Sequence, residues 1–262
     1  PSRIDIGKLA YEWQEVQNDY KTKADFIADK LSAFVQTEAQ SLEPNDVVLY
    51  GFGRIGRLAA RELIKNTGKG QQLRLRAIVT RSNSDNDIIK RASLLRTDSV
   101  HGPFSGTIIE DLENKALVIN GQIVHMIQAS SPDKVDYKSF GIDNALVIDN
   151  TGVFRDREAL GLHLKSEGAG RVLLTAPGNE VPNVVYGINH KALDVKNEKI
   201  YSAASCTTNA ISPVLKVIND HLEIKKGHVE TIHAYTNDQN LLDNMHKKSR
   251  RGRSAAINMV IT

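Results

Sequence analysis

Apolar residues in the first part of the chain recur at spacings of three and four, which is the spacing of one helix face. This stripe lies within residues 6–42, and Pro44 ends it. Its members are Leu9, Trp13, Val16, Tyr20, Ile27, Leu31, Phe34 and Val35. The pattern predicts an amphipathic helix or a helical pair. We interpret it as a packing extension, with a partner-binding helix as the alternative.

From residue 46 the pattern changes to short apolar runs separated by turns. A strand at 46–50, a helix at 57–65 and a strand at 73–80 predict a parallel sheet with helices packed on it. An alternating stretch at 117–127 around Asn120-Gly121 predicts a hairpin. The remaining predicted elements are strands at 145–148, 172–175, 199–204 and 227–234 and helices at 157–166 and 210–222.

Composition narrows the class of protein. A chain of 262 residues is long enough for two domains with separate cores. The formal net charge of +3 is ordinary, so charge implies neither a nucleic-acid nor a membrane partner. We interpret the short basic cluster at 250–253 as a solvated or subunit-facing loop, with phosphate or nucleic-acid binding as the alternative. A single cysteine allows no internal disulfide, which suits a reducing compartment, and we expect a cytoplasmic protein.

The first candidate site is the glycine-rich turn Gly51-Phe52-Gly53-Arg54-Ile55-Gly56, which lies between a predicted strand and a predicted helix. In such a G-x-G-x-x-G turn, the first glycine makes the tight turn and the second lets the backbone approach a pyrophosphate. The third glycine lets the helix pack on the strand. The sequence therefore predicts a dinucleotide site here, and a glycine turn without a ligand is the alternative.

The end of the second predicted strand bears on coenzyme choice. An NAD-specific site normally carries Asp or Glu there to bind the ribose hydroxyls. This chain has Thr80-Arg81-Ser82 instead, and Asp85 comes only later. A hydroxyl and an arginine can accept the 2′-phosphate of NADP, which a carboxylate would repel. Alternatively, Arg81 is a solvated surface charge and NAD binds without the acid, so the predicted cofactor is NAD or NADP.

The only cysteine, Cys206, lies in Ser205-Cys206-Thr207-Thr208-Asn209, at the junction of a β-rich run and a helix. A thiol in the first turn of a helix is close to unpaired backbone N–H groups, which favour the thiolate. The flanking hydroxyls and the helix amides can hold an anion beside it. His233 is the candidate base. The pattern predicts a nucleophile, and the alternative is a small buried cysteine of the core.

Five motifs occur in order, and together they resemble the glyceraldehyde-3-phosphate dehydrogenase family. They are GFGRIGR at 51–57, DSVHG at 98–102, NTGVF at 150–154, SAASCTTN at 202–209 and HAYTNDQ at 233–239. The resemblance runs from about residue 46 onward, and residues 1–45 have no counterpart in the typical enzyme. It implies a longer, bacterial-type branch with an α/β fold. We expect a helical N-terminal extension (1–45), a Rossmann dinucleotide-binding domain (46–205) and a partial α+β catalytic domain (206–262).

The resemblance also implies roles for individual residues. Cys206 would attack the aldehyde carbon, and His233 would act as the general base. No metal is expected. The candidate residues of the dinucleotide site are Gly51, Gly53, Arg54, Ile55, Gly56, Thr80, Arg81 and Thr151. The positions that match those holding the substrate and inorganic phosphate are Ser205, Thr207, Thr236 and Asp238.

The family's chain continues beyond residue 262, and the further part supplies other substrate- and nicotinamide-binding residues. We therefore expect the 262 residues to be a C-terminally truncated fragment, inactive alone, of a protein that forms a homotetramer. Its expected partners are a sugar phosphate and inorganic phosphate. Oxidation of erythrose 4-phosphate by the same thiol chemistry is an open alternative. A non-catalytic nucleotide- or RNA-binding relative is another, against which the presence of both Cys206 and His233 argues.

Overall fold

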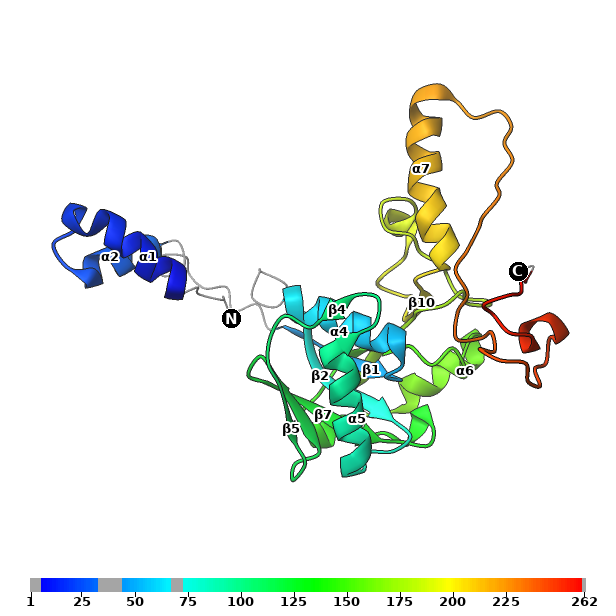
Figure 1. The fold of residues 1–262 in the computed structure, drawn as a ribbon, viewed down its shortest axis with the longest axis horizontal. Coiled ribbons are helices and arrows are strands. Elements are labelled where there is room, and N and C mark those ends of the chain that lie inside the picture. The colour runs from blue at the N-terminus through cyan, green and yellow to red at the C-terminus, as the bar shows by residue number, and fades with distance from the viewer. Residues whose placement is uncertain (1–5, 33–43, 67–72, 261–262) are drawn as a thin grey trace. The chain divides into compact units, whose positions relative to one another are not determined.

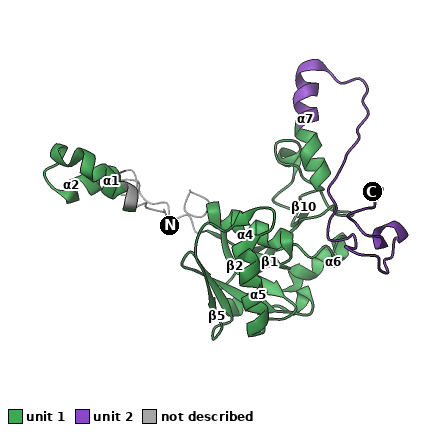
Figure 2. Ribbon diagram, in the orientation of Figure 1, with its two compact units in different colours: residues 1–213 green, residues 214–262 purple. Residues whose placement is uncertain are grey.

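The computed structural model describes residues 6–32, 44–66 and 73–260. The chain divides into two compact units, residues 1–213 and residues 214–262, which are coloured separately in Figure 2. The first unit contains an eight-stranded sheet (Figure 1). The second contains the chain after Pro213, where the regular elements of the described residues are the end of one helix and a short 3-10 turn, η6 (Ser249–Gly252).

Residues 6–32 fold as two helices joined by a turn. Helices α1 (Ile6–Val16) and α2 (Lys23–Lys30) are connected through the 3-10 turn η1 (Gln17–Asp19). Phe26 is 2% exposed, and its ring lies 5.4 Å from that of Trp13 and 5.3 Å from that of Tyr20, between ring centroids. The predicted helical pair is confirmed here. The rest of that prediction, up to residue 42, lies outside the described residues.

The strands of the sheet alternate with helices. In chain order the strands are β1 (Asn45–Tyr50), β2 (Leu73–Thr80), β5 (Ile108–Asp111), β6 (Ala116–Ile119), β7 (Gln122–Gln128), β8 (Ala145–Asp149), β9 (Ala169–Leu174) and β10 (Ile200–Ser202). Their order in the sheet is β10-β9-β8-β1-β2-β7-β6-β5. The first six of these are parallel, and β6 and β5 extend one edge as antiparallel neighbours. A separate pair is formed by β3 (Thr97–Asp98) and β4 (Gly102–Pro103).

Helices follow most of the parallel strands. They are α4 (Arg54–Asn66) after β1, α5 (Asp85–Arg96) after β2, α6 (Arg157–Gly161) with η4 (Leu162–Lys165) after β8, and α7 (Cys206–Leu222) after β10. Shorter 3-10 turns are η2 (Pro132–Lys134), η3 (Lys138–Phe140) and η5 (His190–Ala192). This alternation of strand and helix confirms the predicted α/β fold with a Rossmann-type sheet.

Strand β1 lies at the centre of the sheet and is buried on both faces. Val47, Val48 and Leu49 are each 0% exposed, as expected for a parallel strand covered on two sides. Leu49 belongs to the apolar cluster that includes residues of α4 and α5, whereas Val48 belongs to a second cluster with Tyr137. The two clusters hold β1 between layers, so the loop that leaves its carboxyl end starts from a fixed point.

Most of the strands predicted from the sequence are present, and one is not. The hairpin at Asn120-Gly121 is confirmed, with both residues at positive φ (49° and 79°), as a two-residue type I′ turn requires. The predicted strand at 227–234 is wrong, because these residues form no regular secondary structure and are exposed. A strand needs a neighbour for its N–H and C=O groups, and no other stretch of the described chain pairs with this one.

The strand order reverses between β1 and β8. The chain runs outward from β1 through β2 to β7 on one side, and from β8 through β9 to β10 on the other. In sheets of this kind, ligands bind outside the carboxyl ends of the strands at the point of reversal. The loops after Tyr50 and after Asp149 therefore flank the expected ligand position.

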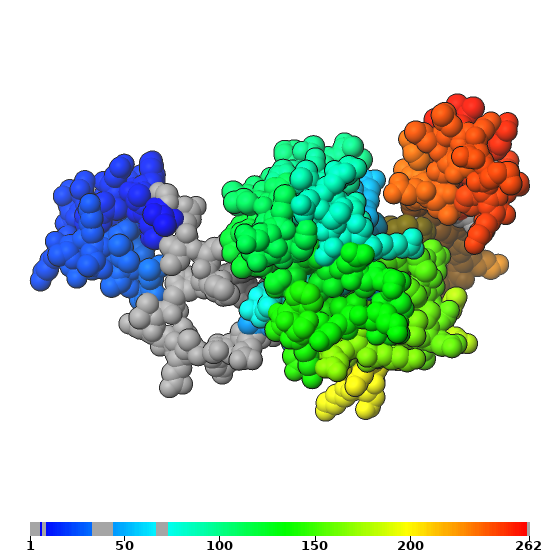
Figure 3. All heavy atoms as spheres, turned by 90° about the horizontal axis from the view of Figure 1, so that it is seen from below, coloured from blue at the N-terminus to red at the C-terminus, as the bar shows by residue number. Residues whose placement is uncertain are grey.

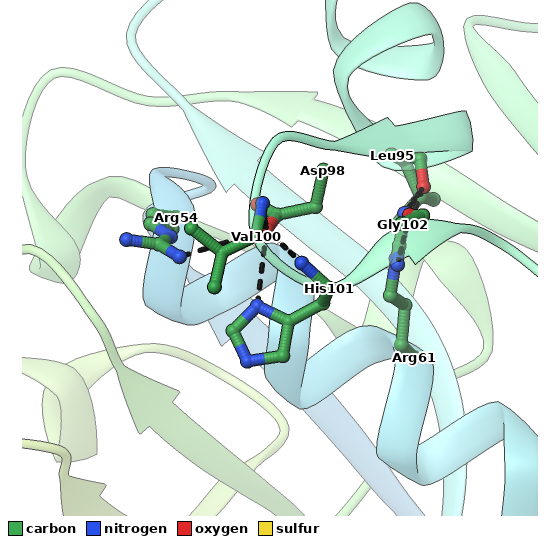
Figure 4. A network of polar contacts seen from close by, with 7 residues as sticks. All are labelled: Arg54, Arg61, Leu95, Asp98, Val100, His101 and Gly102. Atoms are coloured by element: carbon green, nitrogen blue, oxygen red, sulfur yellow. Dashed lines mark hydrogen bonds and ion pairs between the residues drawn. The ribbon is translucent and has the colours of Figure 1, made fainter.

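The guanidinium group of Arg61 ties α4 to the end of α5. Its Nε and Nη2 donate to the carbonyl oxygen of Leu95 at 3.1 and 2.7 Å, and Nη1 donates to that of Gly102 at 3.0 Å (Figure 4). Charged donors of this kind are worth about 1.5–3 kcal/mol each in favourable settings. The contact fixes the helix that begins with the glycine turn.

We predict that Arg61→Ala lowers the free energy of unfolding by about 2 kcal/mol, because two carbonyls lose a charged donor. Urea unfolding followed by circular dichroism measures this. Lys65→Ala on the same helix is the control. Lys65 Nζ lies 3.6 Å from Glu62 Oε1, and both side chains are mostly exposed. Removal of the Lys65 side chain beyond Cβ should therefore change the free energy of unfolding by less than about 0.5 kcal/mol. Equal effects of the two substitutions would contradict the role of Arg61.

Candidate active site

Each of the three glycines of the turn after β1 has a different structural reason to lack a side chain. Gly51 has a φ of +91°, which other residues rarely adopt. A Cβ atom on Gly56 would lie 2.4 Å from the carbonyl oxygen of Gly51, so α4 reaches the turn only because this residue has no side chain. A Cβ atom on Gly53 would meet nothing within 4 Å. The backbone is thus open at Gly53, where a pyrophosphate would approach the start of α4.

A cavity of about 270 Å³ lies beside this turn, at the carboxyl ends of β1, β2 and β8. Four residues predicted for the dinucleotide site, Gly51, Thr80, Arg81 and Thr151, line it together. Gly53, Arg54, Ile55 and Gly56 lie in the adjoining turn and the first turn of α4. The eight predicted positions therefore meet at one edge of the sheet, and the open turn with its helix terminus fits a dinucleotide.

The cavity is also lined by a residue that was not predicted from the sequence to belong to the site. Arg91 of α5 lines it together with Arg81, and the Nε of Arg91 is buried without a hydrogen-bond acceptor in the described chain. A buried donor of this kind favours an anionic group nearby. Thr80 is 7% exposed and its Oγ1 donates to the carbonyl of Ser82 at 2.7 Å.

The carboxylate of Asp87, in the first turn of α5, accepts hydrogen bonds from two serine hydroxyls near the end of β2. Asp87 accepts hydrogen bonds from Ser82 and from Ser84, the latter at 2.9 Å. These two hydrogen bonds hold the pKa of Asp87 below its usual range, and the bond from Ser82 contributes more than the bond from Ser84. The carboxylate is thereby tied to the start of α5, where Ser84 is the N-cap. It does not line the cavity, whereas two arginines do.

The DSVHG motif forms a polar turn beside the start of α4. One carboxyl oxygen of Asp98 accepts from the backbone N–H groups of His101 and Val100 at 2.9 and 3.0 Å, and lies 3.0 Å from His101 Nδ1. Hydrogen bonds from His101 and then Val100 hold the pKa of Asp98 well below its usual range, so it stays ionised. Arg54 Nη2 lies 3.6 Å from the same oxygen (Figure 4). The turn therefore orients the side chain of the first residue of α4.

The cysteine lies where the sequence predicted, at the start of a helix. Strand β10 is followed by Ala204 at a φ of 59°, then Ser205, and Cys206 is the first residue of α7. The Oγ of Ser205 accepts from the N–H of Thr208 at 2.9 Å, which is N-cap geometry. Cys206 is exposed, which rules out the alternative of a buried core cysteine. Thr207 lies in the same first turn.

The other predicted catalytic and phosphate-binding residues lie in the second unit. His233 is exposed in a stretch without regular secondary structure, and its Nδ1 lies against the carbonyl oxygen of Ala234. Thr236 lies three residues further along. The carboxylate of Asp238 is 2.7 Å from Arg251 Nη1 and 3.7 Å from His246 Nε2. The structure describes Cys206 in one unit and His233 in the other, so their pairing stays a prediction.

Two kinds of feature are absent from the described residues. No group of three or more His, Cys, Asp or Glu side chains in them is arranged to hold a metal ion. None of the helices in the described ranges combines the length and the apolar character that crossing a membrane requires.

The sheet order, the glycine turn and the cavity define a Rossmann-type dinucleotide-binding protein with a thiol at the carboxyl edge of the sheet. Sequence comparison identifies the family. The profile of the glyceraldehyde 3-phosphate dehydrogenase NAD binding domain matches residues 45–157, and that of the C-terminal domain matches residues 205–262. The chain belongs to the glyceraldehyde-3-phosphate dehydrogenase family, whose cofactor is NAD(P).

Relatives agree with the two profiles. A glyceraldehyde-3-phosphate dehydrogenase-like protein of Pseudomonas aeruginosa (strain UCBPP-PA14) is 55% identical over 261 residues, which cover 99% of this chain and 56% of that protein. The glyceraldehyde-3-phosphate dehydrogenases of Clostridium pasteurianum and Thermotoga maritima are 40% and 42% identical over 217 residues, covering 82% of this chain and 61% and 62% of theirs. The chain thus spans about three fifths of the length of these curated relatives.

The alignments with these relatives cover different lengths of the chain. The dehydrogenase-like protein of Pseudomonas aeruginosa aligns with 99% of the chain, whereas the Clostridium and Thermotoga enzymes align with 82%. The difference is comparable in length to residues 1–44. Residues 1–44 also precede the region that the profile of the NAD binding domain matches.

The glycine turn gives a matched pair of variants. We predict that Gly53→Ala changes the free energy of unfolding by less than about 0.5 kcal/mol, because the methyl group meets nothing within 4 Å, but weakens NAD binding about tenfold by narrowing the approach. Gly56→Ala should instead lower stability by about 1–3 kcal/mol, because its Cβ overlaps the Gly51 carbonyl. Urea unfolding and titration calorimetry separate the two effects. Loss of stability in Gly53→Ala would contradict the assignment.

Proposed function

We propose that the whole protein oxidises glyceraldehyde 3-phosphate to 1,3-bisphosphoglycerate, with NAD(P) and inorganic phosphate as the other reactants. The proposal depends most on one observation: Cys206 is exposed at the first residue of α7, at the same edge of the sheet as the dinucleotide cavity. Family membership and the names of the relatives support the choice of sugar phosphate. By the same resemblance we propose a cytoplasmic homotetramer.

The chemistry begins with the thiol. Unpaired backbone N–H groups at the start of α7 favour the thiolate of Cys206. Its sulfur forms a bond to the aldehyde carbon, and the former carbonyl oxygen takes up the proton that His233 drew from the thiol. This step gives a hemithioacetal and returns His233 to its unprotonated form. His233 then removes the proton from the hemithioacetal hydroxyl as hydride leaves the same carbon, and a thioester remains. NAD(P), when bound, supplies the nicotinamide that accepts this hydride.

Phosphate completes the cycle. A phosphate oxygen attacks the thioester carbon, the carbon–sulfur bond breaks, and the Cys206 thiolate is regenerated as the acyl phosphate leaves. The hydroxyls of Thr207 and Thr236 are the proposed contacts for the phosphate groups of substrate and attacking phosphate. Ser205 and Asp238 have internal roles in the structure, as helix cap and as partner of Arg251, and their proposed substrate contacts come in addition to these.

The nucleophile is tested by replacing the sulfur. We predict that Cys206→Ser lowers the turnover of glyceraldehyde 3-phosphate by roughly four orders of magnitude, and that His233→Asn lowers it by about 10²–10⁴-fold, as for loss of a general base. NAD affinity, measured by titration calorimetry, is the control and should be unchanged in both variants. An active serine variant would rule out the thioester. Faster turnover of erythrose 4-phosphate than of glyceraldehyde 3-phosphate by the wild type would change the proposed substrate but not the chemistry.

Coenzyme choice is tested at the end of β2. Because Arg81 and Arg91 line the cavity and no carboxylate does, we predict that the wild type binds NADP within about tenfold of NAD. Thr80→Asp should weaken NADP binding about tenfold more than NAD binding, because it adds a negative charge near the 2′-phosphate. Thr80→Asn has nearly the same shape without the charge and is the control. Strong discrimination against NADP by the wild type would contradict the prediction.

A further inference from the structure

A fully buried polar pair lies behind the dinucleotide cavity and touches its wall. Asp149 is the last residue of β8 and His163 lies in η4, and both side chains are 0% exposed. His163 Nε2 lies 2.9 Å from Asp149 Oδ2. A buried carboxylate of this kind must be satisfied by donors, because its desolvation is otherwise costly.

The second oxygen of Asp149 holds the loop that follows β8. Oδ1 accepts from the backbone N–H of Thr151 at 2.8 Å and from its Oγ1 at 2.7 Å. Thr151 Oγ1 in turn accepts from the N–H of Val153 at 3.1 Å. A continuous chain of hydrogen bonds therefore runs from His163 through Asp149 to the two loop residues that line the cavity.

Thr151 is placed against the glycine turn. A Cβ atom on Gly51 would lie 2.9 Å from Thr151 Cγ2, so the two loops that flank the ligand position are in close contact. The ring of His163 also packs edge-on against Tyr50 and Phe154, with centroids 4.7 and 5.8 Å apart. Both rings line the cavity. The imidazole thus supports the wall through a hydrogen bond and through ring packing.

Only one nitrogen of the imidazole makes a polar contact. Nδ1 of His163 is buried and has no hydrogen-bond partner within the described ranges. Nε2 faces a carboxylate oxygen, so it carries the proton and acts as the donor. A side chain with a single N–H donor at the position of Nε2 would therefore preserve every hydrogen bond of the pair.

We infer that Asp149 and His163 are positioning residues for the dinucleotide: His163 orients the carboxylate, and the carboxylate fixes the Thr151 loop against the glycine turn. The inference rests on the family's NAD(P) binding at this cavity and not on the proposed sugar phosphate. Without the His163 donor, Asp149 keeps a buried lone pair unmet and turns toward other donors, which releases Thr151.

The test measures the Kd for NAD by titration calorimetry of the whole protein, without a sugar phosphate. His163→Leu should weaken binding about tenfold or more, whereas His163→Gln, whose Nε2 replaces that of histidine, should stay within about threefold of wild type. Where His163→Leu yields no folded protein, His163→Asn replaces it with the same expectation, because its shorter amide does not reach Asp149. Equal weakening by Gln and Leu, or no weakening by Leu, overturns the inference.

Two controls separate positioning from general loss of stability. Leu117→Ala removes a fully buried side chain in β6, away from the cavity. It should lower the urea midpoint by at least as much as His163→Leu does, while the Kd for NAD stays within about twofold of wild type. In a Thr151→Val background, which lacks the hydroxyl bonded to Asp149, His163→Leu should add less than about threefold, because both changes break one chain of bonds. Weakened binding in Leu117→Ala, or full additivity of the two site changes, overturns the inference. Because no substrate is present, failure of the proposed reaction does not alter these outcomes.

Discussion

The close approach of the first turn of α4 to the carbonyl oxygen of Gly51 is the constraint on which the dinucleotide site depends. A Cβ atom at Gly56 would lie 2.4 Å from that oxygen, so the helix is seated directly on the end of β1. Because the helix is seated there, its free amides point to the place where the strand order reverses. The loop after β8 closes on the same point, with Thr151 against Gly51. Helix, turn and loop are thus fixed by backbone contacts that leave no room for side chains at two positions.

Elements with a local signal could be predicted from the sequence. The bounds of β2 agree with the predicted strand, the hairpin follows from Asn120-Gly121, and the glycine turn follows from its spacing. Helix α5 is not among the predicted elements, although Ser84 caps it and Asp87 follows three residues later, a spacing that marks the start of a helix. This spacing predicts a helix that contains Arg91, but it does not predict that Arg91 lies at the cavity. That position depends on how α5 packs on the sheet, which no local pattern encodes.

Two other features show where sequence patterns stop being informative. Residues 227–234 have the composition of a strand, yet pairing decides whether a strand forms, and the described chain offers them no partner. Asp149 and His163 lie in different elements, so the periodicity of a single helix or strand does not relate them, and each resembles an ordinary polar residue. Their contact exists because η4 folds back against the end of β8. A buried pair between two elements is a property of tertiary packing, and only the structure reveals it.

The turn after β10 places the thiol at the start of a helix. Ala204 adopts a left-handed conformation (φ 59°), which costs a residue other than glycine about 1–3 kcal/mol. The surrounding hydrogen bonds over-determine this turn: Ser202 Oγ accepts from the N–H of Ala204 at 2.9 Å, and Asn209 Nδ2 donates to the carbonyl of Ala203 at 2.7 Å. The turn is what allows Cys206 to start α7 immediately after β10. Stabilisation of the thiolate by the amides at the start of α7 therefore depends on the turn that follows β10, whereas the role of His233 as its base is a separate proposal.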